Sequence, residues 1–168
     1  MSQFYCREDE LRKLNKRYAG DKFECIVIYG RRRVGKTALI NEFCKDKPTI
    51  FFSALNTTGK ENLEALSKSI MSFERPDMES APEFRSYDAA LDELTALSKE
   101  KRIVFVIDEY PYLAKDKTSY FSDAAAHHRP QMDRVQDVPD SLRLLYELHG
   151  ESGAWQGKSA VWQAYWPV

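Results

Sequence analysis

CIVIYGRRRVGKT, at residues 25–37, is the stretch of sequence that decides the fold. Residues 25–29 form an unbroken apolar run, which is typical of a strand buried on both faces of a parallel sheet. A glycine ends this run, and residues 36–45 continue with a helical pattern that Pro48 stops. The stretch therefore predicts a strand, a glycine-containing loop and a helix in direct succession.

The loop from Gly30 to Thr37 has the pattern of a phosphate-binding loop, GxxxxGK followed by Ser or Thr. Its glycines let the backbone wrap closely, so that successive N–H groups and the positive end of the helix point at a phosphate. Lys36 is predicted to reach the β- and γ-phosphates of a nucleotide, and the Thr37 hydroxyl to bind Mg²⁺. The alternative is a glycine turn with an exposed lysine, which the flanking strand and helix disfavour. The candidate nucleotide-binding residues of this loop are Gly30, Arg31, Arg32, Arg33, Val34, Gly35, Lys36, Thr37 and Ala38.

A second polar cluster follows another apolar run. Residues 103–107 (IVFVI) predict a buried strand, and Asp108 and Glu109 come directly after it. Asp108 is placed to hold Mg²⁺ through water, and Glu109 is the candidate base that orients and deprotonates an attacking water. The alternative is a pair of surface acids after a core strand. Lys36 and Glu109 are thus the candidate catalytic residues, and Thr37 and Asp108 the candidate metal ligands.

The rest of the first 118 residues alternates between helix and strand. The pattern predicts a helix at residues 8–18, a strand at 49–54, a helix through 63–70 that Asn56, Thr57 or Thr58 caps, and a helix at 86–99. Strands that alternate with helices indicate an α/β fold with a mostly parallel sheet, whose ligands bind at the carboxyl ends of the strands. Both polar clusters fall at such ends.

Two features beside these clusters have less specific meanings. Arg31, Arg32 and Arg33 form either a positive rim for a phosphate or a solvated loop, and we assign them no catalytic role. Tyr110 and Tyr112, on either side of Pro111, predict a rigid turn after the strand, with stacking on a base as a minor alternative.

Composition sets broad limits. The chain has 168 residues, the length of one domain, and its 25 lysines and arginines nearly balance 26 aspartates and glutamates. Net charge therefore gives no reason to expect nucleic acid or an anionic membrane as partner. Cys6, Cys25 and Cys44 are odd in number and lack metal-ligand spacing, which indicates reduced structural thiols. No apolar run is long enough to span a bilayer, and we expect a cytoplasmic protein.

Three segments resemble one known family. Residues 29–37 (YGRRRVGKT), 106–114 (VIDEYPYLA) and 4–11 (FYCREDEL) are similar to the archaeal-type ATPases of archaea and bacteria, which are related to the AAA+ and STAND ATPases. The resemblance covers the N-terminal part of the chain, residues 1–118. It implies the three-layer sandwich of the P-loop NTPases with a mostly parallel sheet, and ATP with Mg²⁺ as cofactors. It also implies that Arg7 in the opening segment lies against the nucleotide, although Cys6 stands where the family has glycine.

The resemblance ends near Thr118. Residues 119–168 hold all three tryptophans, all three histidines and no isoleucine, whereas the preceding part has seven isoleucines and no tryptophan. Read one base later, the codons of residues 162–166 permit GRRTG and those of residues 137–151 permit MFLILCGSSMSFME, which resemble segments of related proteins. We therefore expect residues 119–168 to be a frameshifted tail without a domain of its own. The alternative is a divergent C-terminal segment, which a metal bound by His127, His128 and His149 would favour.

The shifted frame has a consequence for the sheet. In the related ATPases, the strand resembling LILCGSS lies between the phosphate-loop strand and the Asp-Glu strand, and we find no counterpart for it in the written frame. We therefore expect an incomplete sheet without its central strand. Such a chain is expected to bind ATP poorly and not to hydrolyse it, because the two apolar strands would pair directly and misplace the site.

The leading hypothesis for function is ATP binding and Mg²⁺-dependent ATP hydrolysis by a P-loop ATPase, of which this chain is a truncated or frameshifted part. The alternative is a non-hydrolysing ATP-binding switch module, which would keep Lys36 and Thr37 but need no working Glu109. A small-molecule kinase would need an acceptor pocket and an arginine-rich lid, and no such segment stands out. The expected partners are the nucleotide and a protein or nucleic acid that the sequence does not identify, with no membrane.

Overall fold

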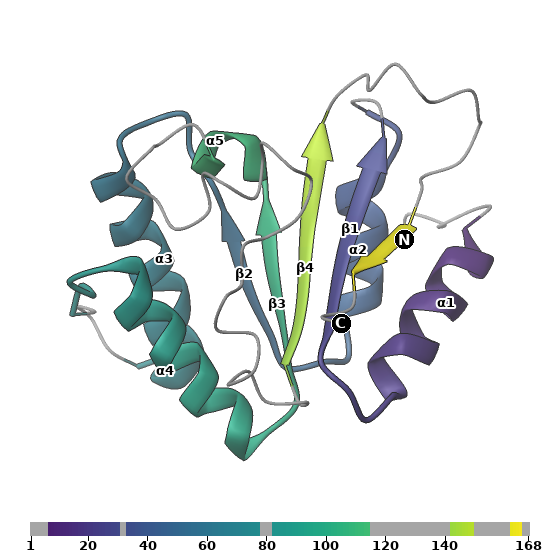
Figure 1. Cartoon of the computed structure of the whole chain (residues 1–168), viewed down its shortest axis with the longest axis horizontal. Helices are drawn as coiled ribbons and strands as arrows, with labels where there is room; N and C mark the ends of the chain where they lie inside the picture. Colours follow the sequence, from purple (N-terminus) through teal and green to yellow (C-terminus); the bar gives the residue numbers. More distant parts are fainter. Residues whose placement is uncertain (1–6, 31–32, 78–81, 115–141, 150–161, 166–168) are drawn as a thin grey trace.

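The structure is a computed structural model that describes residues 7–30, 33–77, 82–114, 142–149 and 162–165. Helices and strands alternate along the chain, as the sequence predicted (Figure 1). Among the described residues no helix is both long enough and apolar enough to cross a membrane. The elements are α1 (Glu8–Ala19), β1 (Glu24–Gly30), α2 (Lys36–Cys44), β2 (Thr49–Ser53), α3 (Gly59–Glu74), α4 (Tyr87–Glu100), β3 (Ile103–Asp108), α5 (Tyr110–Ala114), β4 (Leu142–His149) and β5 (Trp162–Tyr165).

The described strands form one sheet in the order β2-β3-β4-β1-β5. The pairs β2–β3, β3–β4 and β4–β1 are parallel, and β5 pairs antiparallel with β1. Parallel neighbours need crossover connections, and the one between β2 and β3 contains α3 and α4. Because parallel strands point the same way, Gly30 at the end of β1 and Asp108 at the end of β3 lie at the same edge of the sheet. The α/β fold with a mostly parallel sheet is confirmed.

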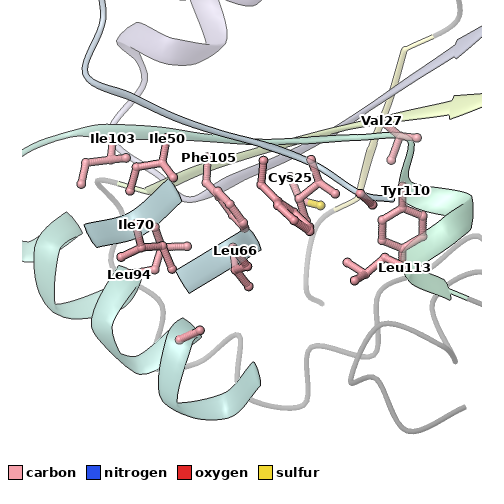
Figure 2. Packing of buried hydrophobic residues seen from close by; sticks show 14 residues of the cluster. Cys25, Val27, Ile50, Leu66, Ile70, Leu94, Ile103, Phe105, Tyr110 and Leu113 are labelled. Carbon is pink, nitrogen blue, oxygen red and sulfur yellow. The ribbon is translucent and has the colours of Figure 1, made fainter. Parts of the chain in front are cut away.

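Helices cover both faces of this sheet (Figure 1). Alternate residues of β1 and β3 pack against α3 and α4 on one face, and the residues between them pack against α1 and α2 on the other. The strands are therefore apolar on both sides, which explains why residues 25–29 and 103–107 are unbroken apolar runs. Figure 2 shows the first cluster, whose labelled members are Cys25, Val27, Ile50, Leu66, Ile70, Leu94, Ile103, Phe105, Tyr110 and Leu113.

The helix α3 begins with a capping box. The Thr58 hydroxyl accepts a hydrogen bond from the Glu61 N–H at 3.3 Å, and the Glu61 carboxylate accepts one from the Thr58 N–H at 3.1 Å. Of the three caps that the sequence offered, Thr58 is the one used. Hydrogen bonds from the Thr57 and Thr58 hydroxyls lower the pKa of Glu61. The stability that these hydrogen bonds to the Glu61 carboxylate contribute is therefore present at a pH above the pKa of this group in the unfolded chain. It is lost as the pH falls through the lowered pKa of the folded state.

The expectation of a missing central strand was wrong. Residues Leu142–His149 form β4, which lies between β1 and β3 and pairs in parallel with both. Leu145, for example, has Ile26 of β1 and Val106 of β3 as its partners across the sheet. The written sequence LRLLYELH is rich in leucine and has a tyrosine, and a central strand of a parallel sheet takes such residues. The strands β1 and β3 consequently do not pair with each other.

A second difference concerns the residues after β3. Tyr110–Ala114 form the short helix α5, where the sequence predicted only a rigid turn. Proline is tolerated in the first turn of a helix, where its missing N–H has no acceptor within the helix, so Pro111 does not prevent this helix.

The other expectations for residues 119–168 largely concern segments outside the described residues. His127 and His128, two members of the suggested metal site, are among them. The two described segments of this region, β4 and β5, belong to the same sheet as β1, β2 and β3. The frameshift itself stays a hypothesis about the nucleotide sequence.

Replacing Leu145 with proline should test the position of β4. Proline removes a backbone N–H from a strand that has neighbours on both sides, so the free energy of unfolding should fall by at least about 2 kcal/mol. The matched control is Gln163→Pro in β5, which has β1 as its one partner among the described strands and should lose less. Urea unfolding of both variants gives the comparison. Equal losses, or no loss at residue 145, would contradict a central β4.

Candidate functional site

The described end of the loop between β1 and α2 has a backbone conformation that favours glycine. Gly35 has a φ of 82°, in the left-handed region that favours glycine, and Arg33 has a φ of 63°. A Cβ added to Gly35 would meet no atom within 4 Å, so the described residues leave open space beside the loop at this point. Arg33 and Val34 are exposed, whereas Arg31 and Arg32 lie outside the described residues. The predicted arginine rim therefore stays a prediction.

Lys36 and Thr37 occupy the first turn of α2. Lys36 is 3 % exposed, which is rare for a lysine, while Thr37 and Ala38 are exposed. Gly35, the N-cap residue of α2, has no side chain that could bond to the N–H groups of the first turn. These N–H groups and the helix dipole make the end of α2 electrostatically favourable for an anion.

Arg7 connects the start of α1 to this loop. Its Nη2 donates a hydrogen bond to the carbonyl oxygen of Val34, the residue before Gly35. Its Nη1 is buried and has no hydrogen-bond partner among the described residues. A buried guanidinium N–H without an acceptor is costly, so an anionic or polar ligand beside the loop would improve this arrangement.

The position of Arg7 depends on how α1 is anchored. Leu14 is fully buried against α2, and the Tyr18 ring meets the Phe43 ring edge to face, with centroids 6.1 Å apart. At the far end of the helix, Arg17 pairs with Glu24 at 2.9 Å. These contacts fix α1 against the start of β1 and α2, and thereby hold Arg7 at the loop.

Asp108 lies at the carboxyl end of β3, and its main chain and side chain both have partners. Its carbonyl oxygen accepts a hydrogen bond from the Ala54 N–H, and its Oδ1 accepts one from the Glu109 N–H, each at 2.9 Å. Val104 and Val106 face α2, and side chains alternate along a strand, so Asp108 lies on the α2 face as well. The acid and the phosphate-loop helix therefore share one face of the sheet.

Glu109 leaves the strand in an unusual backbone conformation. Its φ is 53°, in the left-handed region that a non-glycine residue adopts only at a cost. Its carbonyl oxygen accepts a hydrogen bond from the Tyr112 N–H at 3.0 Å, and its side chain is half-buried. The next residue, Tyr110, is buried, and this burial raises the pKa of its hydroxyl well above the usual range.

The topology sets the spacing of the two clusters. The strand β4 separates β1 from β3, so the loop and Asp108 start about two strand spacings, ~9.6 Å, apart. The sheet thus brings Gly30, Lys36, Thr37, Asp108 and Glu109 to one edge, as the sequence predicted. Without β4 these groups would be one spacing closer.

Ser53 is a further polar residue beside the candidate site, and the sequence did not predict it there. Ser53 ends β2 and is the register partner of Asp108, so both side chains lie on the same face of the sheet. Ser53 is exposed at the edge that carries the candidate site. The adjoining backbone is well held, because the buried Asn62 side chain bonds to the N–H and the carbonyl of Leu55 at 2.8 and 3.0 Å. The signal in the sequence was a polar residue at the end of an apolar run (TIFFS), but this run does not show which strand pairs with it.

Comparison with known proteins gives a consistent result. The family model of an ATPase domain found predominantly in Archaea matches residues 4–127. An uncharacterised protein of Methanocaldococcus jannaschii is 34% identical over 119 residues, which are 71% of this chain and 24% of that protein. An uncharacterised ATP-binding protein of the same organism is 46% identical over 44 residues, or 26% of this chain and 75% of that protein. The chain thus spans about a quarter of the length of the first relative.

Solved structures share the fold. The Orc1 protein of Aeropyrum pernix, determined in complex with DNA, has a TM-score of 0.60 and 17% identity, over 91% of this chain and 41% of that one. The Cdc6p protein of Pyrobaculum aerophilum has a TM-score of 0.54 and 13% identity, over 90% and 41%. At these identities the similarity concerns the fold alone.

Replacing Gly35 with alanine should strain the loop. The left-handed φ of 82° disfavours a residue with a Cβ, so the free energy of unfolding should fall by about 1 kcal/mol. The open space around the Cβ position excludes a clash with the described residues as the cause. The comparison is Gly35→Asn, which should lose less, because asparagine tolerates the left-handed region better than alanine. Denaturant unfolding in which Gly35→Asn loses as much stability as Gly35→Ala would contradict the left-handed loop.

Proposed function

The chain belongs to the family of ATPase domains found predominantly in Archaea, and from that premise we propose that it binds ATP with Mg²⁺ and hydrolyses it. The observation that carries the proposal is the shared position of two groups. Lys36 in the first turn of α2 and Asp108 at the end of β3 lie at the same edge and on the same face of the sheet. A site of this kind can hold a polyphosphate at the helix end and a hydrated metal at the acid.

The residues present fit a nucleotide. The loop offers backbone N–H groups and open space at Gly35, and Lys36 supplies a cation for the β- and γ-phosphates. The buried Nη1 of Arg7, which has no acceptor among the described residues, fits a ligand that brings its own oxygen atoms. We therefore assign nucleotide binding to Arg7 and to the loop residues from Gly30 to Ala38.

The residues also fit Mg²⁺. The Thr37 hydroxyl and the Asp108 carboxylate are hard oxygen ligands of the type that Mg²⁺ prefers, and Asp108 has one carboxylate oxygen besides the one bonded to the Glu109 N–H. When bound, the metal neutralises charge on the phosphates. Thr37 and Asp108 would hold it, directly or through water.

In this proposal Glu109 acts on the attacking water. Its carboxylate follows that of Asp108 directly in the chain, on a half-buried residue whose backbone has left the strand. Such a carboxylate can orient a water and accept its proton. Lys36 stabilises the charge that develops on the transferred phosphoryl group.

The role of the reaction in the cell is a separate proposal. One structural neighbour, the Orc1 protein, was determined in complex with DNA. We propose a nucleic acid or a protein as the partner that ATP binding would control, as for a molecular switch. The expected poor ATP binding rested on a missing central strand, and β4 removes that reason.

The first test removes the cation. Lys36→Ala should weaken Mg²⁺-ATP binding about 10- to 100-fold, because it deletes charge-assisted hydrogen bonds to the phosphates. Isothermal titration calorimetry on the folded full chain measures the change. Lys68→Ala, which removes an exposed lysine of α3, is the control and should leave affinity unchanged. Equal affinity of Lys36→Ala and the parent would refute the phosphate-loop assignment.

The second test separates binding from hydrolysis. Glu109→Gln should keep the ATP affinity within about twofold but lower the turnover rate about 100-fold, because an amide cannot accept the proton of water. Phosphate release measures turnover, with Glu100→Gln at the opposite edge of the sheet as control. Turnover of Glu109→Gln at the parent rate would leave Glu109 a structural acid. A parent chain that binds ATP without turnover would instead support the non-hydrolysing switch module.

A further inference from the structure

Side chains along β3 alternate between the two faces of the sheet, and this alternation ends at Asp108 and Glu109. Ile103, Phe105 and Ile107 belong to the cluster that faces α3 and α4, so a continued strand would turn Glu109 into the same cluster. The left-handed φ of Glu109 ends this alternation one residue early. Tyr110, rather than Glu109, is then the next side chain after Ile107 in the cluster that faces α3 and α4.

Tyr110 is firmly held in that place. It is 2 % exposed, and Leu113, which is 1 % exposed, lies beside it (Figure 2). A buried aromatic ring contributes more apolar contact than most side chains, so its burial can offset the strain of one left-handed residue. The backbone of Glu109 is fixed on both sides, by the bond from its N–H to Asp108 and by the bond from the Tyr112 N–H to its carbonyl oxygen.

We propose that Tyr110 is a positioning residue for Glu109: its buried ring holds the Glu109 backbone in the left-handed region and so keeps the carboxylate out of the core and at the site. This inference rests on the proposed function where it concerns turnover. Tyr110 itself does not contact the reacting atoms in this scheme. Its effect should therefore be seen in the rate and not in nucleotide affinity.

The first experiment compares rate and affinity in the full chain. Tyr110→Ala should lower kcat at least about tenfold and change the ATP affinity less than about twofold, because a shift of ~1 Å in a catalytic group is already costly. Tyr110→Phe keeps the ring and should retain kcat within about twofold. If Tyr110→Ala does not fold, Tyr110→Leu takes its place and should still lower kcat severalfold with unchanged affinity.

Leu113→Ala is the matched control. Leu113 lies in the same helix and the same cluster but does not follow Glu109 directly in the chain. Its loss should therefore lower stability and leave kcat within about twofold at a temperature where all variants are folded. A kcat loss at Leu113 as large as that at Tyr110 would show a general packing effect and overturn the proposal. Parent-like kcat in Tyr110→Ala would also overturn it.

A second experiment needs no turnover. In the parent, Glu109→Gly should have a folding equilibrium constant about threefold or more above that of Glu109→Ala, because glycine is unstrained at this φ. In the Tyr110→Ala background this difference should vanish, since the backbone is free to relax. A difference that persists there would overturn the role of Tyr110. If the parent does not hydrolyse ATP, the proposed function fails, and this comparison alone decides the inference.

Discussion

The structure depends on the backbone pairing of β3, a strand in the interior of the sheet with helices over both of its faces. Residues 103–107 of β3 are buried between helices on both faces, so their backbone N–H and C=O groups need a neighbouring strand on each side. The strands β2 and β4 provide these neighbours. The same requirement sets the position of β1, which pairs with the other edge of β4. The distance between the phosphate loop and the acids is therefore a consequence of backbone hydrogen bonding.

The groups of the site come from parts of the chain that this pairing brings together. The loop and Lys36 precede Asp108 by about seventy residues, and Arg7 enters from a helix that lies against α2. Each group is held by contacts away from the ligand side: α1 by Leu14 and Tyr18, the end of β3 by Ala54, and the turn after it by Tyr110. Ordering of this kind before ligand binding lowers the entropy lost when a ligand binds.

Local patterns made much of this predictable. Residues 25–37 carry their own strand, turn and helix signals, and Asp108 follows an apolar run that is typical of a buried strand. The strand β4 was missed because one of its two partners, β1, lies more than a hundred residues earlier, and because Arg143 and Glu147 interrupt its apolar pattern. Ser53 was missed because its neighbour in the sheet follows from register, which a single strand does not contain. The left-handed Glu109 was missed because it results from a competition between Glu109 and Tyr110 for one place in the core.

The lengths of the strands have a consequence for the behaviour of the protein in concentrated solution. The sheet tapers from eight residues in β4 to five in β2 and four in β5, the two outermost of the described strands. An edge strand of four or five residues offers an approaching chain few hydrogen-bonding groups, so strand-to-strand association between molecules gains little per encounter. The apolar strands β1 and β3, which have a high β-propensity, lie inside the described sheet and are thus shielded from pairing with other copies of the protein.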